Sequence, residues 1–409
     1  MTHRPPTLRD VVIVGGSLAG LHAAEELRAA GYDGTLTLVS AERRAPYDRP
    51  PLSKQILTGE WAPDRSALRS AEDLAALRAE VLLGVHATGL DVTSRIVTTD
   101  DGLRLPYDGL VLATGCTPRT LRGEAAREGL HTLRTAEDSL ALRRTLLTGG
   151  HLVVVGAGFI GMEVAAAART LGADVTVVEP APAPMQAALG ERIGGALADL
   201  HRAHGVKFAL GRGISRILGP NRVEGVEFDD GTILGADAVL VGIGAAPATG
   251  WLAGSPLDTS NGVVCDAHLA AGPPGIYAAG DLACWDNPLF GARMRVEHWS
   301  NATEQGAAAA RNLLAAQDER QPFASVPYFW SDQYDTSIQF AGRPGSERVP
   351  IVEADGPKPA FLVLTGEGGT LTGVLSVNSQ RVFLRIRRMI KARATLADAA
   401  DAARAFLSR

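Results

Sequence analysis

Two segments of the chain, about 140 residues apart, repeat one plan of strand, glycine-rich turn, helix and second strand. In the first segment, the β-branched run at residues 10–14 leads into GGSLAG at residues 15–20. In the second, HLVVV at residues 151–155 leads into GAGFIG at residues 156–161. Units of this kind build parallel sheets and bind dinucleotides at the turn, where the helix N-terminus faces the phosphates. We therefore expect an α/β protein with two Rossmann-like dinucleotide-binding domains.

The second turn has glycine at all three positions of the dinucleotide-binding pattern, Gly156, Gly158 and Gly161. Glu179 follows 23 residues after Gly156, at the end of the next expected strand. A carboxylate at about this spacing accepts hydrogen bonds from an adenosine ribose. Because its charge would repel a 2′-phosphate, Glu179 favours NADH over NADPH. The alternative is a solvated glutamate at the end of a strand.

The first turn departs from this pattern, because Ser17 replaces the middle glycine and the acidic residue after the second strand, Glu42, is displaced. Serine is small, so the surrounding strand–turn–helix unit still favours a dinucleotide site. Glu42 is either a ribose ligand or an exposed side chain. The chemistry that needs two dinucleotides is hydride transfer from a nicotinamide to a flavin.

The composition disfavours several other classes of protein. Of the 409 residues, 46% are hydrophobic and 21% are charged, which is typical of a globular protein. The net charge of −5 disfavours nucleic-acid binding, because a phosphate backbone attracts positive charge. The sequence has no apolar stretch of about 18 residues, and its first apolar run is too short for a signal peptide. We expect a cytoplasmic protein that binds neither membranes nor nucleic acid.

The cysteines and two of the histidines predict no further reactive site. Cys116, Cys265 and Cys284 lie far apart, without a CxxC or zinc pattern, which suits a reducing compartment. His201 and His204 have the i,i+3 spacing of neighbours on a helix, but no third ligand is evident. We expect no metal site, and we expect both histidines at the surface.

Seven short segments carry a resemblance to a known family. They are PYDRPPLSK (46–54), LATG (112–115), LRT (133–135), GIG (242–244), GIYAAGD (275–281), RVEHW (295–299) and FWSDQY (329–334). In these segments the chain resembles FAD-dependent NADH:ferredoxin reductases of the putidaredoxin reductase and biphenyl dioxygenase ferredoxin reductase type. Such proteins are the reductase components of bacterial cytochrome P450 and ring-hydroxylating dioxygenase systems. The resemblance covers essentially the whole chain.

The resemblance implies three domains. They are a discontinuous FAD domain at residues 1–115 and 245–322, an NADH domain at residues 116–244, and a small α+β C-terminal domain at residues 323–409. The strand pattern agrees, because the strands ending at Gly115 and Gly280 can return to the first sheet.

The resemblance also implies roles for individual residues. Lys54 is expected near the flavin, Glu163 at the nicotinamide–flavin contact where it pairs with Lys54, and Trp330 near the isoalloxazine ring. The alternatives are an exposed lysine, a glutamate that stabilises a helix N-terminus and a core tryptophan. Asp281 is expected to bind the ribityl chain, to cap a helix that begins beyond it, or both. The residues expected to contact FAD or NADH, besides Lys54 and Glu163, are Gly15, Ser17, Leu18, Ala19, Gly20, Glu42, Arg49, Ala87, Ala113, Thr114, Gly115, Arg134, Gly156, Gly158, Phe159, Ile160, Gly161, Glu179, Gly244, Gly280, Asp281, Glu297, His298 and Trp299.

The expected reaction is electron transfer without a thiol relay. Residues 41–60, where the related disulfide reductases carry redox cysteines, contain no cysteine. The resemblance implies that NADH gives a hydride to FAD, and that electrons then pass singly to a [2Fe–2S] ferredoxin serving a cytochrome P450 or a dioxygenase. One alternative is the same core used with rubredoxin, oxygen or a quinone. Another is a flavin-binding interaction protein similar to apoptosis-inducing factor.

The last part of the chain contains an unusually basic helical segment. It carries Arg381, Arg385, Arg387, Arg388 and Lys391 without any acidic residue, in a chain with a net charge of −5. An acidic ferredoxin would be attracted to this segment. We expect it to form part of the docking surface, the alternative being a solvated basic helix face. We expect a monomer or a weak dimer.

Overall fold

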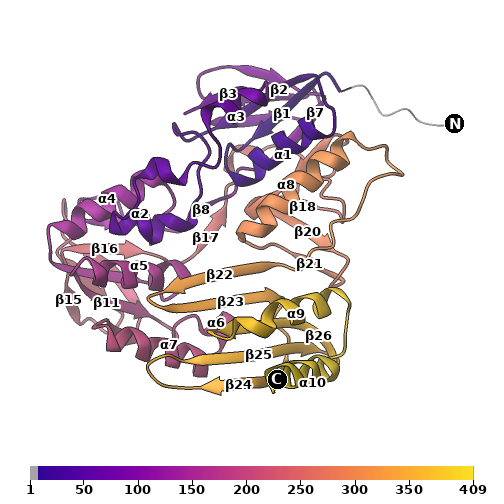
Figure 1. Ribbon diagram of the computed structural model, residues 1–409. Helices are drawn as coiled ribbons and strands as arrows, with labels where there is room; N and C mark the ends of the chain where they lie inside the picture. Colours follow the sequence, from indigo (N-terminus) through magenta and orange to yellow (C-terminus); the bar gives the residue numbers. More distant parts are fainter. Residues whose placement is uncertain (1–7, 409) are drawn as a thin grey trace. The chain divides into compact units, whose positions relative to one another are not determined.

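The computed structural model describes residues 8–408, and its internal contacts divide the chain into two compact units (Figure 1). Unit 1 contains the chain up to Asp48, Ala67–Thr117 and Ala246–Tyr328. Unit 2 contains Arg49–Ser66, Pro118–Ala245 and the chain from Phe329 onward. The segment that carries Lys54 thus belongs to unit 2. The three-domain division drawn from the sequence stays a prediction.

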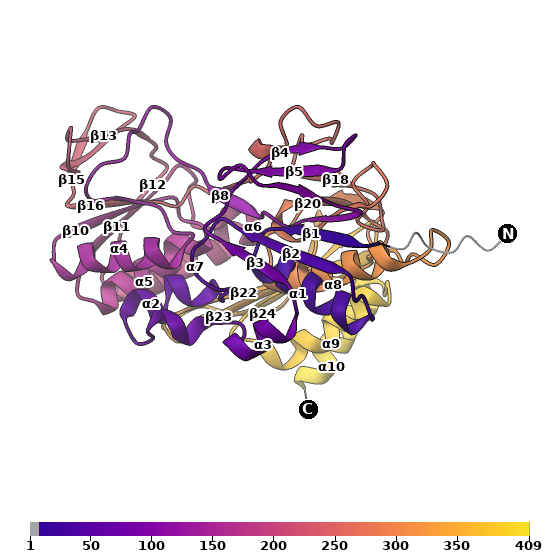
Figure 2. The same cartoon turned by 90° about the horizontal axis from the view of Figure 1, so that it is seen from above.

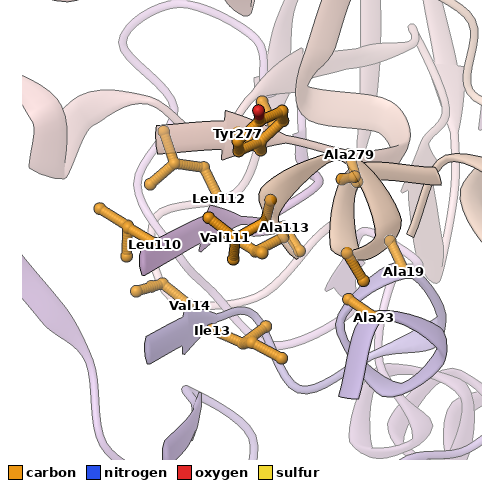
Figure 3. Packing of buried hydrophobic residues seen from close by; sticks show 14 of the residues in the cluster. Ile13, Val14, Ala19, Ala23, Leu110, Val111, Leu112, Ala113, Tyr277 and Ala279 are labelled. Carbon is orange, nitrogen blue, oxygen red and sulfur yellow. The ribbon is translucent and has the colours of Figure 1, made fainter. Parts of the chain in front are cut away.

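Unit 1 is built on a five-stranded parallel sheet with the order β19-β7-β1-β2-β3. Its strands are β1 (Asp10–Val14), β2 (Thr35–Ser40), β3 (Glu80–Leu83), β7 (Gly109–Leu112) and β19 (Ile276–Ala278). The expected return of the two later strands is confirmed, because β7 pairs with β1 and β19 pairs with β7. One buried hydrophobic cluster contains side chains of β1, β7 and β19, such as Val14, Val111 and Tyr277 (Figure 3).

Two helices of unit 1 pack closely against each other. They are α1 (Leu18–Ala29) and α8 (Trp299–Leu314), which lie side by side in Figures 1 and 2. A Cβ atom at Gly306 of α8 would overlap the backbone oxygen of Ala19 in α1. The glycine therefore lets α8 approach the start of α1 directly.

The smaller elements of this unit are α3 (Ala71–Ala76), β4 (Ala87–Asp91), β5 (Ile96–Thr99), β6 (Arg104–Pro106), β18 (Val263–Cys265), β20 (Ala283–Asn287) and β21 (Ala292–Met294).

Unit 2 contains a second five-stranded parallel sheet with the order β12-β11-β10-β16-β9. Its strands are β9 (Leu130–His131), β10 (His151–Val155), β11 (Asp174–Glu179), β12 (Lys207–Leu210) and β16 (Ala238–Val241). Its helices are α2 (Gln55–Thr58), α4 (Ala136–Leu147), α5 (Phe159–Thr170), α6 (Gln186–Leu189) and α7 (Glu191–Ala203). A three-stranded antiparallel sheet follows, formed by β13 (Ile214–Leu218), β14 (Gly225–Phe228) and β15 (Ile233–Gly235). The connecting strands β8 (Cys116–Pro118) and β17 (Ala245–Pro247) pair with each other.

The C-terminal part of unit 2 is an antiparallel sheet with two helices, as expected for an α+β segment (Figure 1). Its elements are β22 (Tyr328–Gln333), β23 (Thr336–Gly342), β24 (Glu347–Ala354), β25 (Ala360–Glu367), β26 (Thr370–Val377), α9 (Gln380–Lys391) and α10 (Leu396–Leu407). Ile338, Phe340 and Phe361 of this sheet share one hydrophobic cluster with Val154 of β10 and Leu197 of α7. This shared core explains why the C-terminal part belongs to the same unit as the second parallel sheet.

The α/β class with two Rossmann-like sheets is therefore confirmed. Between residues 8 and 408, no helix combines the length and the apolar character needed to cross a membrane. The prediction for His201 is wrong, because its side chain is fully buried within α7. His204, one turn later, is exposed as expected.

Candidate functional site

The first glycine turn joins β1 to α1 at the carboxyl edge of the sheet in unit 1. Gly15 has a φ of 122°, and a Cβ atom there would overlap the backbone oxygen of Ala113. A Cβ atom at Gly20 would overlap the backbone oxygen of Gly15, so these glycines allow the tight turn and the close helix. Ser17 is the N-cap residue of α1, but its side chain makes no capping hydrogen bond. The N-terminus of α1 has no acidic residue in its first turn and can therefore face an anion.

Glu42 lies just beyond the end of β2. The Tyr47 hydroxyl donates a hydrogen bond to its carboxylate, and the Gly84 N–H donates to its backbone oxygen at 3.0 Å. Glu42 is half-buried, so it is not the freely exposed side chain of the alternative. The residues after Gly84 lead into β4, which begins at Ala87. The structure thus brings the displaced acid close to the segment that contains Ala87.

Gly280 and Asp281 follow β19 at the same edge of the unit 1 sheet. The Gly280 N–H donates to Gln305 Oε1 of α8 at 2.9 Å. The N-cap alternative for Asp281 is wrong, because Asp281 lies inside a short 3₁₀ turn whose N-cap residue is Ala279. Strand β20 follows this turn directly at Ala283, so no α-helix begins there.

The RVEHW segment leads into the N-terminus of α8. Arg295 donates to Glu297 at 2.8 Å and to the backbone oxygen of Asp281 at 3.1 Å. His298 is the N-cap residue of α8, and Trp299 is its first residue. Trp299 is 38% exposed, and its Nε1 donates to Asp48 Oδ1 at 2.7 Å. The ring is therefore anchored at its nitrogen and not packed as a core tryptophan.

The second glycine turn joins β10 to α5 in unit 2 and follows the same geometry. Gly156 has a φ of 99°, and a Cβ atom there would crowd the backbone oxygen of Gly242. A Cβ atom at Gly161 would overlap the backbone oxygen of Gly156. Gly158, by contrast, is exposed and has no atom within 4 Å of its Cβ position. The middle position therefore faces open space, which lets a ligand approach the backbone.

Glu179 ends β11 beside this turn. Its carboxylate accepts a hydrogen bond from the Ala157 N–H at 2.8 Å and from the Ala181 N–H at 3.0 Å. Both contacts hold the carboxylate next to the glycine turn. Glu179 stays half-buried at the end of the strand, so its role as a ribose ligand remains a prediction.

A buried ion pair lies one helical turn beyond the same glycine turn. Glu163 of α5 is 4% exposed, and its Oε2 lies 2.6 Å from Lys54 Nζ, whose side chain is 17% exposed. The expected pairing is thus present, and the exposed-lysine alternative is wrong. Since α5 begins at Phe159, Glu163 lies in the second helical turn. The structure therefore favours an ion pair with Lys54 over the alternative of a glutamate that stabilises the helix N-terminus.

Two serines complete the surroundings of Glu163. The Ser53 hydroxyl donates to Oε2, and the Ser331 hydroxyl donates to Oε1 at 2.6 Å. A buried carboxylate needs such donors, because an unpaired buried charge is costly. Sequence reasoning missed Ser53 and Ser331, although both lie in segments it singled out. In β22, buried Ser331 and Gln333 flank exposed Asp332, as the alternation of side chains along a strand requires, but three consecutive polar residues give no signal in the sequence for which of them are buried.

The remaining expected residues of unit 2 lie on several elements. Arg49 donates to the backbone oxygen of Arg134 at 2.6 Å. The rings of Phe159 and Phe329 are 4.6 Å apart. Trp330 of β22 is half-buried. The other expected residues here, exposed in the structure, are Ile160 and Gly244.

Comparisons with known proteins identify the family. A family model described as pyridine nucleotide-disulphide oxidoreductase matches residues 9–306. The chain belongs to this pyridine nucleotide-disulphide oxidoreductase family. A second model, described as reductase C-terminal, matches residues 328–407, which are β22 to α10.

Members of the family with known names are similar over nearly the whole chain. The ferredoxin–NAD(+) reductase component of the anthranilate 1,2-dioxygenase system of Burkholderia cepacia is 40% identical, covering 93% of this chain and 94% of that protein. The structure of a covalent putidaredoxin reductase–putidaredoxin complex matches with a TM-score of 0.88 at 32% identity, covering 95% and 94% of the two chains. A ferredoxin reductase structure from Rhodopseudomonas palustris matches with a TM-score of 0.89 at 33% identity, covering 97% and 98%.

The family membership makes this protein an FAD-dependent oxidoreductase with FAD and NADH as its cofactors. The structure fits both groups. Each glycine turn ends at a helix N-terminus without an acidic residue in its first turn, and the middle position of the second turn is open.

The disulphide chemistry in the family's description has no counterpart here. The chain's three cysteines are all buried and unbonded, and burial raises the pKa of the Cys265 and Cys284 thiols. No group of three His, Cys, Asp or Glu residues between residues 8 and 408 is placed to hold a metal ion.

Proposed function

We propose that this protein is an NADH-dependent reductase that passes electrons, through FAD, to a [2Fe–2S] ferredoxin serving a cytochrome P450 or a ring-hydroxylating dioxygenase. The observation that carries the proposal is the buried Lys54–Glu163 pair next to the second glycine turn. The three cysteines of the same chain are unbonded. A cation held by a buried carboxylate suits electron transfer to a flavin, whereas thiol relay would need a cysteine pair.

The two glycine turns have separate roles in this proposal. The turn of unit 1, with Gly15, Ser17 and the edge residues Thr114 and Asp281, holds FAD. The turn of unit 2, with Gly156 and Glu179, holds NADH. The FAD held in unit 1 would supply the redox chemistry, taking a hydride from NADH and passing electrons singly to the acceptor protein.

The protein's own residues bind, orient and supply charge. Glu179, fixed by two backbone N–H groups, accepts hydrogen bonds from the adenosine ribose and excludes a 2′-phosphate. Glu163 holds the Lys54 ammonium in one position. Lys54 then stabilises negative charge on the reduced cofactor. Trp299 and Trp330 line the flavin.

The proposed docking surface for the ferredoxin is the exposed face of α9. Val382, Phe383 and Ile386 of this helix are buried, while Arg381, Arg385 and Arg388 are exposed. Leu384 lies among them and is 64% exposed. A basic face with an exposed apolar side chain suits an acidic partner, because opposite charges steer the encounter and the apolar group anchors it.

An anaerobic stopped-flow experiment tests the function. The oxidised holoenzyme is mixed with NADH, and the reduced enzyme is then mixed with a [2Fe–2S] ferredoxin, a rubredoxin, a quinone or oxygen. Loss of the flavin's visible absorbance with NADH, followed by fast recovery with ferredoxin, is the expected result. Fast recovery with another acceptor but not with ferredoxin would reject the proposed partner. A slow reaction with every acceptor would favour an interaction role.

A further inference from the structure

A polar network runs through the interior of unit 2 from α7 to the Lys54–Glu163 pair. It consists of His201, Gln333, Ser331 and Glu163. His201 Nε2 lies 2.9 Å from Gln333 Oε1, Gln333 Nε2 lies 3.2 Å from Ser331 Oγ, and Ser331 Oγ lies 2.6 Å from Glu163 Oε1. All four residues are buried. The network thus connects a fully enclosed histidine with the carboxylate that holds Lys54.

Every hydrogen bond in the network points the same way. Glu163 pairs with Lys54 as a carboxylate, and a carboxylate only accepts hydrogen bonds. Ser331 has a single hydroxyl hydrogen, so it donates this hydrogen to Glu163 and accepts from Gln333. The amide nitrogen of Gln333 therefore faces Ser331, and its oxygen faces His201. His201 must then carry its proton on Nε2.

The surroundings of His201 keep the ring in this neutral form. It lies against Tyr334 and Phe208, with ring centroids 5.0 Å and 6.4 Å away. Burial lowers the pKa of His201 to about 4. Its Nδ1 is buried and has no hydrogen-bond partner within residues 8–408. A second proton would have no protein acceptor there, and the ring therefore donates through Nε2.

We propose that His201 is a positioning residue for the NADH reaction: through Gln333 and Ser331 it fixes the Glu163 carboxylate, and Glu163 in turn fixes the Lys54 ammonium. This inference rests on the proposed function. A directional set of hydrogen bonds in a buried region of low dielectric strengthens each of its members. Loss of the histidine donor leaves Gln333 free to turn its amide, and Ser331 is then free to turn away from Glu163.

The first test is nitrogen-15 NMR of the holoenzyme labelled at histidine, with the His201 signals assigned by their loss in His201→Gln. The expected result is a neutral ring protonated on Nε2. A proton on Nδ1 would overturn the proposal, because the network would then run in the opposite direction. This measurement uses the wild type, so it stays decisive even where a variant fails to fold.

The second test is the rate constant for flavin reduction by NADH in three variants. His201→Phe keeps an aromatic ring but removes the donor, and we expect the rate constant to fall by about three- to tenfold. His201→Gln keeps an N–H donor and is expected to recover most of the loss. His204→Phe is the matched control, because His204 stacks on Tyr334 at 3.7 Å outside the network.

Wild-type rates in His201→Phe, or equal losses in His201→Phe and His201→Gln, would overturn the proposal. Both tests precede the transfer of electrons to any acceptor protein. A wild type that NADH reduces but ferredoxin does not reoxidise would therefore reject the proposed function and leave the role of His201 standing.

Discussion

Two glutamates of unit 2 show how differently a carboxylate can be held close to one glycine turn. Glu179 accepts hydrogen bonds from two backbone N–H groups and stays half-buried. Glu163 is enclosed and takes its donors from the Lys54, Ser53 and Ser331 side chains. The first arrangement leaves the carboxylate accessible to a ligand. The second uses the carboxylate to place a cation.

Replacement of Glu179 tests the coenzyme preference. In Glu179→Arg, the negative charge that repels a 2′-phosphate becomes a positive charge that attracts it. We expect the ratio of kcat/KM for NADPH to that for NADH to rise by at least about tenfold. Steady-state kinetics with both coenzymes measures this ratio. Asp174→Arg, at the other end of β11, is the control, and an unchanged ratio in Glu179→Arg would remove Glu179 from coenzyme selection.

Removal of the Lys54 charge tests the energetic coupling of the pair. Lys54→Met leaves Glu163 buried without its cation, which we expect to lower the free energy of unfolding by about 3–5 kcal/mol. The control is Lys358→Ala, which breaks the exposed Lys358–Asp335 pair and is expected to cost less than about 1 kcal/mol. Urea unfolding of both variants measures the difference. Equal costs would mean that the buried pair contributes no more than a surface pair.

At the scale of elements, the local sequence pattern predicts where strands begin and end, whereas tertiary contacts decide which side chains are buried. The buried strands β1 and β10 begin and end where the sequence predicts, because short β-branched runs before glycine are recognisable locally. The burial of His201 could not be predicted in this way. Its partners Gln333 and Phe208 lie on β22 and β12, and a helical spacing reports which residues share a face but not what covers that face.

The basic face of α9 gives a prediction at this scale. In Arg385→Glu/Arg388→Glu, two exposed positive charges become negative, and we expect the apparent KM for an acidic ferredoxin to rise by about tenfold at low salt. The rise should shrink at high salt, because ions screen exposed charges. Flavin reduction by NADH should not change. Arg404→Glu on α10 serves as the control. An equal rise in the apparent KM for ferredoxin in this variant would show that α9 is not the docking surface.

At the scale of the whole molecule, each unit contains a histidine whose surroundings favour the neutral ring: half-buried His298 in unit 1 and fully buried His201 in unit 2. Burial lowers the pKa of His298 in unit 1 and of His201 in unit 2 to about 4, compared with about 6.5 in an unfolded chain. The unfolded state therefore takes up protons first as the pH falls. The contribution of these two histidines to stability is fully present above about pH 6.5 and is lost as the pH falls from that value to about 4.

Urea unfolding at a series of pH values measures this decline. We expect the free energy of unfolding to fall by several kcal/mol as the pH goes from 7 to 4, with a slope of at most about 1.4 kcal/mol per pH unit for each histidine. His201→Gln should show a shallower decline than the wild type. The same slope in both proteins would show that His201 does not bind this proton.

The sequence predicts both glycine turns and the parallel sheets that they belong to, because each has a local signature, and the family resemblance predicts the α+β C-terminal part. It does not predict that residues 49–66 belong to the same unit as residues 118–245 and the chain from Phe329 onward. That grouping depends on contacts such as Ser53 and Ser331 with Glu163, which join residues more than 100 positions apart. Pairing over such distances leaves no period in the sequence.

The interleaving of the two units has a consequence for how the protein is made. The chain passes from one unit to the other after residues 48, 66, 117, 245 and 328. A ribosome therefore completes the sequence of unit 1 only when it reaches Tyr328. The hydrogen bond from Ser331 to the Glu163 carboxylate can form only after that point. Neither unit can mature as an independent N-terminal product. Exchange of one unit between two relatives would likewise require several simultaneous splices in the gene.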